Sequence, residues 1–213
     1  PWVDISGNAS VVVADLEPAR EPIRAAQAEW VSRVRDAARE VGERIDSLLA
    51  SGSGRTMLDL ARAVAASTSG PLVLGASNPV RAFDLAVPTL EGRVVHSNRG
   101  QAGIDGTIAT AVGICLGSGY AGEASAPARE RVTAVMGDLT ACHDASSLAL
   151  AAAARAHLDI VVADDGGGGI FATLEHGRAT SPEAYDRWFG LAQSVDYEAL
   201  AAAYGVAFAR ADA

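Results

Sequence analysis

The sequence has little cysteine, no long apolar run and few cations, and each shortage excludes a class of protein. Two cysteines, Cys115 and Cys142, are too few for a disulfide scaffold and fit a reducing compartment, so we expect a cytoplasmic protein. No apolar run reaches about 18 residues and no signal-peptide pattern is present, which argues against a membrane protein. The net charge of −9 argues against nucleic acid or an anionic membrane surface as a partner.

The length of the chain and its Ser/Gly-rich break suggest one good-sized domain and part of another. Apolar residues at helical spacing predict a long helix over Pro22–Ala50, and a Ser/Gly-rich stretch at Ser51–Gly54 ends it. We expect residues 1–54 to be the tail of a central domain with its linking helix. Residues 55–213 are then a C-terminal domain, truncated at its own C-terminus. The first residue is Pro1 rather than methionine, so we expect a piece of a longer protein.

The second part of the chain alternates between short apolar runs and helix-like segments. The expected strands are Pro71–Gly75, Val94–Val95, Val132–Met136, Leu158–Ala163 and Val206–Ala209. The expected helices are Leu58–Ala66, Asp105–Leu116, Asp144–Ala156 and Tyr197–Tyr204. Such alternation predicts an α/β fold with a doubly wound, mostly parallel sheet that is covered by helices on both faces.

Two of the expected strands run into carboxylates. Asp138 follows one strand directly after Gly137, and Asp164 and Asp165 follow the next strand along the chain. Ligands of open α/β sheets bind outside the carboxyl ends of the strands, and neighbouring strands lie roughly 5 Å apart. Asp138 and Asp165 can therefore share a cation, and hard oxygen ligands suit magnesium with ligand phosphates.

Four consecutive glycines, Gly166–Gly169, follow these acids, and two interpretations of them stay open. They can make space for a bulky phosphorylated cofactor and supply a backbone carbonyl to the metal, or they can form a plain flexible loop. A nicotinamide-binding site is rejected. Gly117–Gly122 matches G-x-G-x-x-G, but it follows a helix and leads into a loop, so the strand–turn–helix context of that motif is absent.

The spacing of these residues resembles a known family. Gly137-Asp138, followed 27 positions later by Asp165, is similar to the thiamine diphosphate-binding motif. Further segments resemble the 2-succinyl-5-enolpyruvyl-6-hydroxy-3-cyclohexene-1-carboxylate synthases, thiamine enzymes of menaquinone biosynthesis. These segments are GASNPVR (Gly75–Arg81), SNRGQAGIDGT (Ser97–Thr107), GDLTACHD (Gly137–Asp144) and GGGIF (Gly167–Phe171). The resemblance extends from about Gly70 to the C-terminus and implies the pyrophosphate-binding domain fold.

The resemblance implies a role for each matching position. Asp138, Asp165 and the carbonyl of Gly167 would hold Mg²⁺ or Mn²⁺. Further contacts to thiamine diphosphate would come from Ser77, Gly103, Ile104, Gly137, Leu139 and Thr140. The substrates, 2-oxoglutarate and isochorismate, would meet Ser77, Arg81, Arg99, Ile170 and Phe171. The implied reaction decarboxylates 2-oxoglutarate and adds the remaining four-carbon unit to isochorismate.

The physical chemistry of the two arginines agrees with these roles. Both substrates are dianions, and a guanidinium binds a carboxylate through two parallel hydrogen bonds. Arg81 and Arg99 each follow a strand-like segment at the expected ligand edge. The alternative is that both are ordinary surface residues, as most arginines are.

The sequence also departs from the family pattern. Asp164-Asp165-Gly166 stands where the family carries amide-rich residues, so a polar side chain is missing at Gly166. The glutamate that activates the cofactor belongs to the family's N-terminal domain, and the cofactor lies between this domain and the N-terminal domain of a second subunit. We therefore expect no catalytic residue in this chain, a homodimer or homotetramer, and no activity of the chain alone.

Two other functions stay open. One is a related 2-oxoacid decarboxylase or acetolactate-type carboligase, and the other is a non-catalytic magnesium–phosphate binding module. Outside the motif, we interpret His143 and Asp144 as helix-capping or surface residues and the two cysteines as packing residues. We expect Trp188-Phe189 to pack a late helix or a subunit contact.

Overall fold

The computed structural model describes residues 25–52, 56–90, 92–98, 103–117 and 131–211. The chain divides into two compact units, residues 1–41 and 42–213. Helix α1 (Ala25–Ala50) is the predicted long helix, and the three residues expected to precede it lie outside the described ranges. None of the helices in the described ranges combines the length and the apolar composition that a membrane crossing requires.

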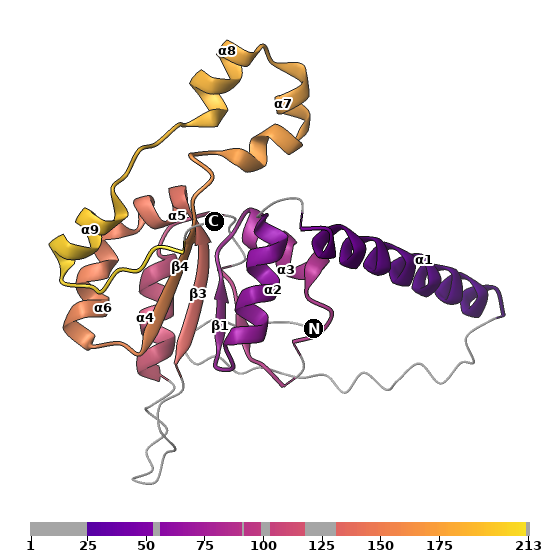
Figure 1. Ribbon diagram of the computed structural model, residues 1–213, viewed down its shortest axis with the longest axis horizontal. Helices are drawn as coiled ribbons and strands as arrows, with labels where there is room; N and C mark the ends of the chain where they lie inside the picture. The colour runs from indigo at the N-terminus through magenta and orange to yellow at the C-terminus, as the bar shows by residue number, and fades with distance from the viewer. Residues whose placement is uncertain (1–24, 53–55, 91, 99–102, 118–130, 212–213) are drawn as a thin grey trace, which may run out of the picture. The chain divides into compact units, whose positions relative to one another are not determined.

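Four parallel strands form the sheet of the second unit (Figure 1). They are β1 (Leu72–Leu74), β2 (Val95–His96), β3 (Val132–Gly137) and β4 (Leu158–Ala163), and all four were predicted. Their order is β2-β1-β3-β4, with parallel pairing throughout. The chain winds from β1 out to β2, then returns past β1 to β3 and on to β4. The direction of winding therefore reverses between β1 and β3.

Helices cover both faces of this sheet, as the alternating pattern predicted (Figure 1). The helices on one face are α4 (Thr107–Gly117), α6 (Leu148–Ala154) and α9 (Tyr197–Tyr204). The helices on the other face are α2 (Met57–Ser67) and α3 (Asn78–Ala86). This doubly wound arrangement leaves the carboxyl ends of the strands open to loops, which is where the predicted site residues lie.

The period of two along β3 divides the core between the faces. Ala134 and Met136 are fully buried and pack with Ile108 of α4, whereas Val135 packs on the opposite face with Phe83 of α3. Side chains of successive strand residues point to opposite faces, so a strand buried on both sides is nearly continuous in apolar residues, and the hydroxyl-bearing residue of β3, Thr133, is buried as well. The apolar sequence of β3 is therefore the signature of a central strand.

Three predictions of secondary structure were incomplete or wrong. The helix expected over Asp144–Ala156 starts with a 3₁₀ turn, η1 (Ala145–Ser147), continues as α6 and ends at Ala154, and a separate short helix, α5 (Asp138–His143), precedes it. The strand expected at Val206–Ala209 does not form: Val206 packs on the core, but Phe208 is 38% exposed and no ladder partner is present among the described residues. Helix α3 was missed, although a proline in its first turn is a start signal.

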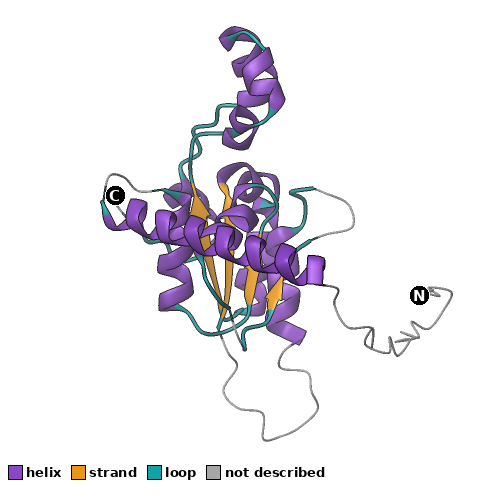
Figure 2. Cartoon of the chain, turned by 90° about the vertical axis from the view of Figure 1, so that its right-hand side faces the viewer, coloured by secondary structure: helices purple, strands orange, loops and turns teal. Residues whose placement is uncertain are grey.

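A chain of short elements follows the carboxyl end of β4 and extends beyond the sheet in both views (Figures 1 and 2). These elements are the 3₁₀ turn η2 (Gly169–Thr173), α7 (Glu175–Ala179), α8 (Pro182–Tyr185) and the π-helical turn η3 (Asp186–Gly190). After η3 the chain returns to the sheet and enters α9. The returning segment brings new side chains to the strand ends.

Candidate functional site

The carboxyl ends of the four parallel strands meet at one edge of the sheet. Gly75 follows β1, Asn98 follows β2, Asp138 follows β3 and Asp164 follows β4. In open α/β sheets ligands bind at the carboxyl edge where the winding direction reverses, and in this sheet that point lies between β1 and β3. The predicted site residues in the described ranges all belong to loops or helix starts at this edge.

The β1 side of the edge carries Ser77 and Arg81. Ser77 precedes α3 with a φ of 85° and a ψ of −138°, a conformation that residues with a side chain rarely adopt. Arg81 lies in the second turn of α3 and is exposed. Within the described ranges no carboxylate pairs with the guanidinium of Arg81, so this positive charge can bind an anionic ligand. Arg99 lies outside the described residues.

Asp138 is the most strongly held residue of the edge. It begins α5, is only 2% exposed, and its Oδ1 accepts a hydrogen bond of 2.7 Å from the backbone N–H of Leu139. Its Oδ2 accepts from the side-chain amide of Gln193 at 2.9 Å. The hydroxyl of Tyr197 donates to its backbone carbonyl at 3.2 Å. A buried carboxylate needs such partners, because burial of an unpaired charge is costly.

Asp164 and Asp165 lie beside Asp138 at the end of the neighbouring strand. Gly137 and Ala163 are partners in the β3–β4 register, so Asp138 and Asp164 follow at the same level. Burial raises the pKa of Asp165, the negative charge of Asp138 raises it further, and a hydrogen bond from the backbone of Gly167 opposes the rise. The structure thus brings the two predicted metal ligands within electrostatic reach of each other.

The glycine run has a more specific structural cause than either open interpretation. Gly166 and Gly167 have φ values of 82° and 147°, which residues with a side chain rarely adopt. A Cβ on Gly167 would clash with the carbonyl oxygen of Gly190, and one on Gly168 with that of Phe189. The backbone N–H of Gly168 also donates to Gly190 at 2.6 Å. These glycines therefore allow the η3 backbone to lie directly against the loop.

Phe171 and Ile170, the predicted wall of the site, lie in η2 immediately after the glycines. The ring of Phe171 lies 6.0 Å from that of Phe189, which in turn stacks on Tyr185. Trp188 is 65% exposed, and the guanidinium of Arg187 lies 4.9 Å from its ring centroid. The prediction that Trp188-Phe189 packs against a late helix is thus met by Phe189.

The remaining predicted cofactor residues occupy two further loops at the edge. Gly103 and Ile104 lie in the loop between β2 and α4, where the Ile104 carbonyl accepts a hydrogen bond from Thr107 at 3.4 Å. Leu139 and Thr140 lie in the first turn of α5, and Thr140 is buried. A Cβ on Gly137, by contrast, would meet no atom within 4 Å, so the approach to the β3 end is open there.

Residues that the sequence analysis placed outside the motif have structural roles. The carboxylate of Asp144 accepts from the backbone N–H groups of Ile108 at 2.6 Å and Ala109 at 3.0 Å, so it caps α4 rather than its own helix. Cys115 is buried in the core, as expected, and burial raises the pKa of its thiol. Cys142 is more than a packing residue, because its sulfur lies 3.3 Å from the hydroxyl of Tyr197.

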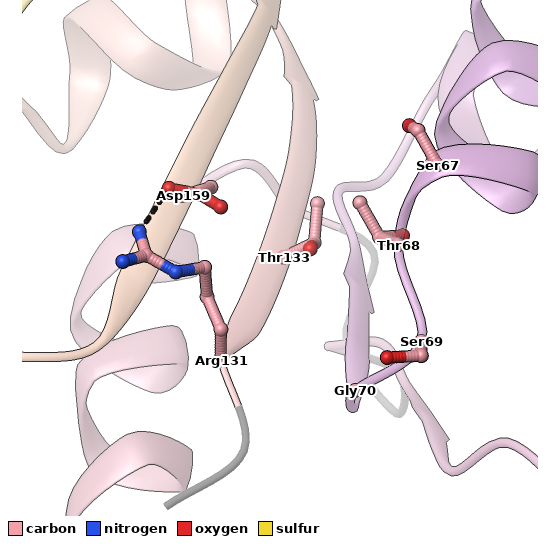
Figure 3. Close-up of a pocket in the computed structure, with 7 residues that line it drawn as sticks. All are labelled: Ser67, Thr68, Ser69, Gly70, Arg131, Thr133 and Asp159. Carbon is pink, nitrogen blue, oxygen red and sulfur yellow. Dashed lines mark hydrogen bonds and ion pairs between the residues drawn. The ribbon is translucent and has the colours of Figure 1, made fainter.

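A separate pocket lies at the opposite, amino-terminal edge of the sheet (Figure 3). Its lining residues are Ser67, Thr68, Ser69, Gly70, Arg131, Thr133 and Asp159. The guanidinium of Arg131 donates to the carboxylate of Asp159 at 2.6 Å. This pocket contains none of the residues of the carboxyl-end site and takes no part in it.

The sequence did not predict Gln193 and Tyr197. Both come from the segment that returns to the sheet after η3, and both bind Asp138 across 55 and 59 positions of sequence. No local pattern marks them, because their role depends on the path of the chain through α7 and α8. Proximity to the start of α9 was the only available signal.

The oxygen donors at this edge fit a divalent cation. Within the described ranges no three His, Cys, Asp or Glu side chains cluster as a ready-made metal site. The proposed set is of another kind, with two carboxylates and one backbone carbonyl. Magnesium is often bound by one or two carboxylates with phosphate oxygens and water completing its octahedron. Asp138 is buried and its negative charge acts on the exposed Asp165, and a cation would relieve the repulsion between the two carboxylates.

Comparison with solved structures shows that this α/β fold also occurs in thiamine diphosphate-dependent enzymes. The structure is similar to a thiamine diphosphate-dependent 4-hydroxybenzoylformate decarboxylase of Rhodococcus jostii RHA1, with a TM-score of 0.55 at 20% identity. The match covers 72% of this chain and 27% of that one. An enzyme of Mycobacterium smegmatis described as thiamin diphosphate-dependent matches with the same TM-score, over 72% of this chain and 26% of its own. At 20% sequence identity, these two matches establish similarity of the fold alone.

Comparison with curated sequences gives nearer relatives. A 2-succinyl-5-enolpyruvyl-6-hydroxy-3-cyclohexene-1-carboxylate synthase of Nocardioides sp. (strain JS614) is 45% identical over 82% of this chain and 32% of its own length. The synthases of the same name from Mycobacterium leprae and Rhodococcus jostii are 39% and 40% identical over 96% of this chain. The chain spans about a third of the length of these relatives, 32–37%.

A family model gives the assignment directly. The thiamine pyrophosphate enzyme C-terminal TPP binding domain matches residues 81–213, a range that begins at Arg81 and includes Asp138, Asp165 and the glycine run. Strand order, the acidic strand ends and the relatives all agree with this match. The chain therefore belongs to the thiamine pyrophosphate enzyme family and carries its C-terminal TPP-binding domain.

Proposed function

We propose that this chain is the cofactor-binding, C-terminal part of a thiamine diphosphate-dependent 2-succinyl-5-enolpyruvyl-6-hydroxy-3-cyclohexene-1-carboxylate synthase of menaquinone biosynthesis. Such an enzyme decarboxylates 2-oxoglutarate and joins the remaining four carbons to isochorismate. The observation that carries the proposal is the juxtaposition of Asp138 with Asp165 at the carboxyl ends of the paired strands β3 and β4, next to the reversal point of the sheet. The names of relatives at 39–45% identity support the choice of reaction.

Asp138, Asp165 and the carbonyl of Gly167 would hold Mg²⁺ in this proposal, with Mn²⁺ as a substitute. Gly137, Leu139 and Thr140 would face the diphosphate, where the open side of Gly137 lets the anion approach the backbone. Ser77, Gly103 and Ile104 would contact the rest of the cofactor. When bound, thiamine diphosphate supplies the carbon nucleophile and electron sink that decarboxylation and carbon–carbon bond formation require.

Binding of the substrates is assigned to the residues around this cofactor. Arg81 is exposed and has no carboxylate partner in the described ranges. It would bind a substrate carboxylate through two parallel hydrogen bonds, and Arg99 would bind another carboxylate. Ile170 and Phe171 would form an apolar wall that excludes water from the reacting carbons, and Ser77 would offer a hydroxyl. The chain supplies binding and orientation in this scheme, and no residue of it is proposed to move a proton.

The remaining part of the active site is proposed to come from elsewhere. The activating glutamate belongs to the N-terminal domain of related enzymes, so a homodimer or homotetramer would complete the site and the chain alone would be inactive. We also propose a cytoplasmic location, which the two unpaired cysteines support.

Replacing Asp138 tests the proposal in the full-length protein that it implies. We expect Asp138→Ala to lose measurable thiamine diphosphate binding and turnover, because it removes the buried carboxylate on which the cation depends. Calorimetric titration of the cofactor with magnesium and consumption of 2-oxoglutarate in the presence of isochorismate measure the two losses. Asp84→Ala, an exposed acid on α3, is the matched control and should retain both. Undiminished cofactor affinity in Asp138→Ala would remove Asp138 from the site.

A further inference from the structure

The side-chain amide of Gln193 joins two strand ends of the candidate site. Its Nε2 donates to Oδ2 of Asp138 at 2.9 Å and to Oδ1 of Asp164 at 3.0 Å. These acids follow β3 and β4 at the same level of the register. One neutral amide thus uses its two N–H bonds to hold two carboxylates that would otherwise repel each other.

The orientation of this amide is set by its own backbone segment. Oε1 of Gln193 accepts from the backbone N–H of Val195 at 2.7 Å, so the NH₂ group must point the other way, toward the acids. A reversed amide would place oxygen against two carboxylates and a backbone donor against an NH₂ group. The backbone N–H of Gln193 also donates to the carbonyl of Gly166 at 3.3 Å. The side-chain amide is therefore oriented by Val195, and the backbone that carries it is held by Gly166.

The same segment holds the backbone of Asp138. The Tyr197 hydroxyl, four residues beyond Gln193, donates to the Asp138 carbonyl at 3.2 Å. Asp138 is 2% exposed, and its Oδ1 is occupied by the N–H of Leu139. Its remaining rotational freedom depends on Oδ2, which is the atom that Gln193 holds. A carboxylate oxygen has two lone pairs, so this bond leaves one lone pair of Oδ2 for a cation.

We propose that Gln193 is a positioning residue for the divalent cation of this site. It acts through Asp138, fixing the direction of the carboxylate that receives the metal, and it ties the loop after β4 to the same point. Partners that orient a ligand in this way typically contribute 10- to 100-fold to metal affinity. The inference deepens the proposed function and rests on it, because it requires that Asp138 binds the cation.

The test is the affinity for Mn²⁺ of the full-length protein at saturating thiamine diphosphate, measured from the EPR signal of free Mn²⁺. We expect Gln193→Met, which keeps the length of the side chain and removes the amide, to weaken binding about 10- to 100-fold. The magnesium concentration for half-maximal turnover should rise by a similar factor, while kcat at saturating magnesium is largely retained. That split distinguishes positioning from a general structural defect.

Two further variants complete the design. Ser194→Ala changes the exposed neighbour of Gln193, for which no hydrogen bond of the side chain is found in the described structure, and should bind Mn²⁺ as the wild type does. Gln193→Ala removes the side chain without adding bulk and should reproduce the loss. Gln193 is half-buried in a loop, so both variants should fold, which circular dichroism and the melting temperature verify.

The outcomes separate the inference from the function on which it rests. Unchanged Mn²⁺ affinity in both Gln193 variants, with binding lost in Asp138→Ala, would overturn the positioning role alone. Tighter binding in those variants would also overturn it, since Gln193 would then compete with the cation. Absence of Mn²⁺ and cofactor binding in the wild type would overturn the proposed function and the inference together.

Discussion

The glycine run is one sequence feature with a separate cause at each position. Gly166 and Gly167 are required by their positive φ, Gly167 and Gly168 by the carbonyls of η3, and Gly169 by the carboxylate of Asp165, which a Cβ would meet. The loop is therefore shaped by close contact with other parts of the protein. This contact carries the predicted metal carbonyl of Gly167, so the position of η3 and the geometry of the site are linked.

The Gly168→Ala variant tests this contact. The φ of Gly168 is −85°, outside the left-handed region, so the main expected cost comes from the clash with the Phe189 carbonyl and the Phe171 ring. Overpacking of this kind typically costs about 1–3 kcal/mol in the free energy of unfolding. We expect faster amide exchange over residues 186–191 and weaker binding of thiamine diphosphate.

The matched control for that variant is Gly113→Ala. Gly113 lies exposed within α4, where an added Cβ would meet no neighbour within 4 Å. Alanine there should raise the free energy of unfolding by about 0.5–1 kcal/mol, because it is the better helix former. Equal stabilities of the two variants in urea would show that the η3 backbone does not rest on Gly168.

The acids of the site could be predicted from the sequence, but the residues that hold them could not. Asp138 and Asp165 each follow an apolar run, and parallel strands deliver their carboxyl ends to one edge. Gln193 reaches Asp138 only because the chain leaves the sheet, forms α7 and α8, and returns. That path is determined by tertiary contacts, such as the hydrogen bond from Tyr185 to the Gly168 carbonyl, which no periodicity encodes.

Among the elements, the interruption between α5 and α6 shows tertiary structure overriding helix propensity. The sequence from Asp144 onward is rich in alanine and predicts one helix, yet the chain tightens into a 3₁₀ turn at Ala145–Ser147. The Asp144 carboxylate accepts from the first turn of α4 and from the Ser147 hydroxyl at 2.6 Å. These bonds draw the chain toward α4 and satisfy N–H groups that a helix start leaves without partners.

Asp144→Ala should therefore destabilise the domain without touching the candidate site. The backbone N–H groups of Ile108 and Ala109 would lose their acceptor in a buried position, at a cost of about 1–3 kcal/mol. Urea denaturation should show a lower midpoint at an unchanged slope. Asp144→Asn retains one oxygen acceptor and should lose less. A midpoint equal to that of the wild type would mean that water replaces the cap.

The strands were easier to predict than the short elements. The strands β1 and β3 coincide with apolar runs that are buried on both faces, and β2 and β4 each pair with one of these two strands. The run at Val206–Ala209 has the same composition, but it has no strand beside it among the described residues, and only Val206 contacts the core. Composition determines whether a segment can pair, whereas the sheet order determines whether a partner is present.

At the scale of the whole molecule, strand order and net charge act together on the proposed chemistry. The order β2-β1-β3-β4 places the reversal point between Ser77 and Asp138, so residues proposed for the substrate and for the cation lie on its two sides. The net charge of −9 repels a dianionic substrate at long range. A synthase acting on 2-oxoglutarate therefore depends on a local cation, and the acids at the site make this requirement stronger.

Of the two arginines proposed to bind the substrate, Arg81 is the one in the described ranges, and its replacement distinguishes the proposed reaction from that of a monocarboxylate enzyme. A hydrogen bond to a charged group contributes about 1.5–3 kcal/mol, so Arg81→Ala should raise the KM for 2-oxoglutarate roughly 10- to 150-fold in the full-length protein. Arg81→Lys keeps the charge but not the planar fork and should recover only part of the affinity. Arg33→Ala, an exposed arginine of α1, serves as the control for the loss of one positive charge. An unchanged KM for 2-oxoglutarate in Arg81→Ala would contradict this role. So would equal turnover of a small monocarboxylate by the wild type and Arg81→Ala. Either result would indicate a substrate with no second carboxylate for an arginine to bind, as in a simple 2-oxoacid decarboxylase.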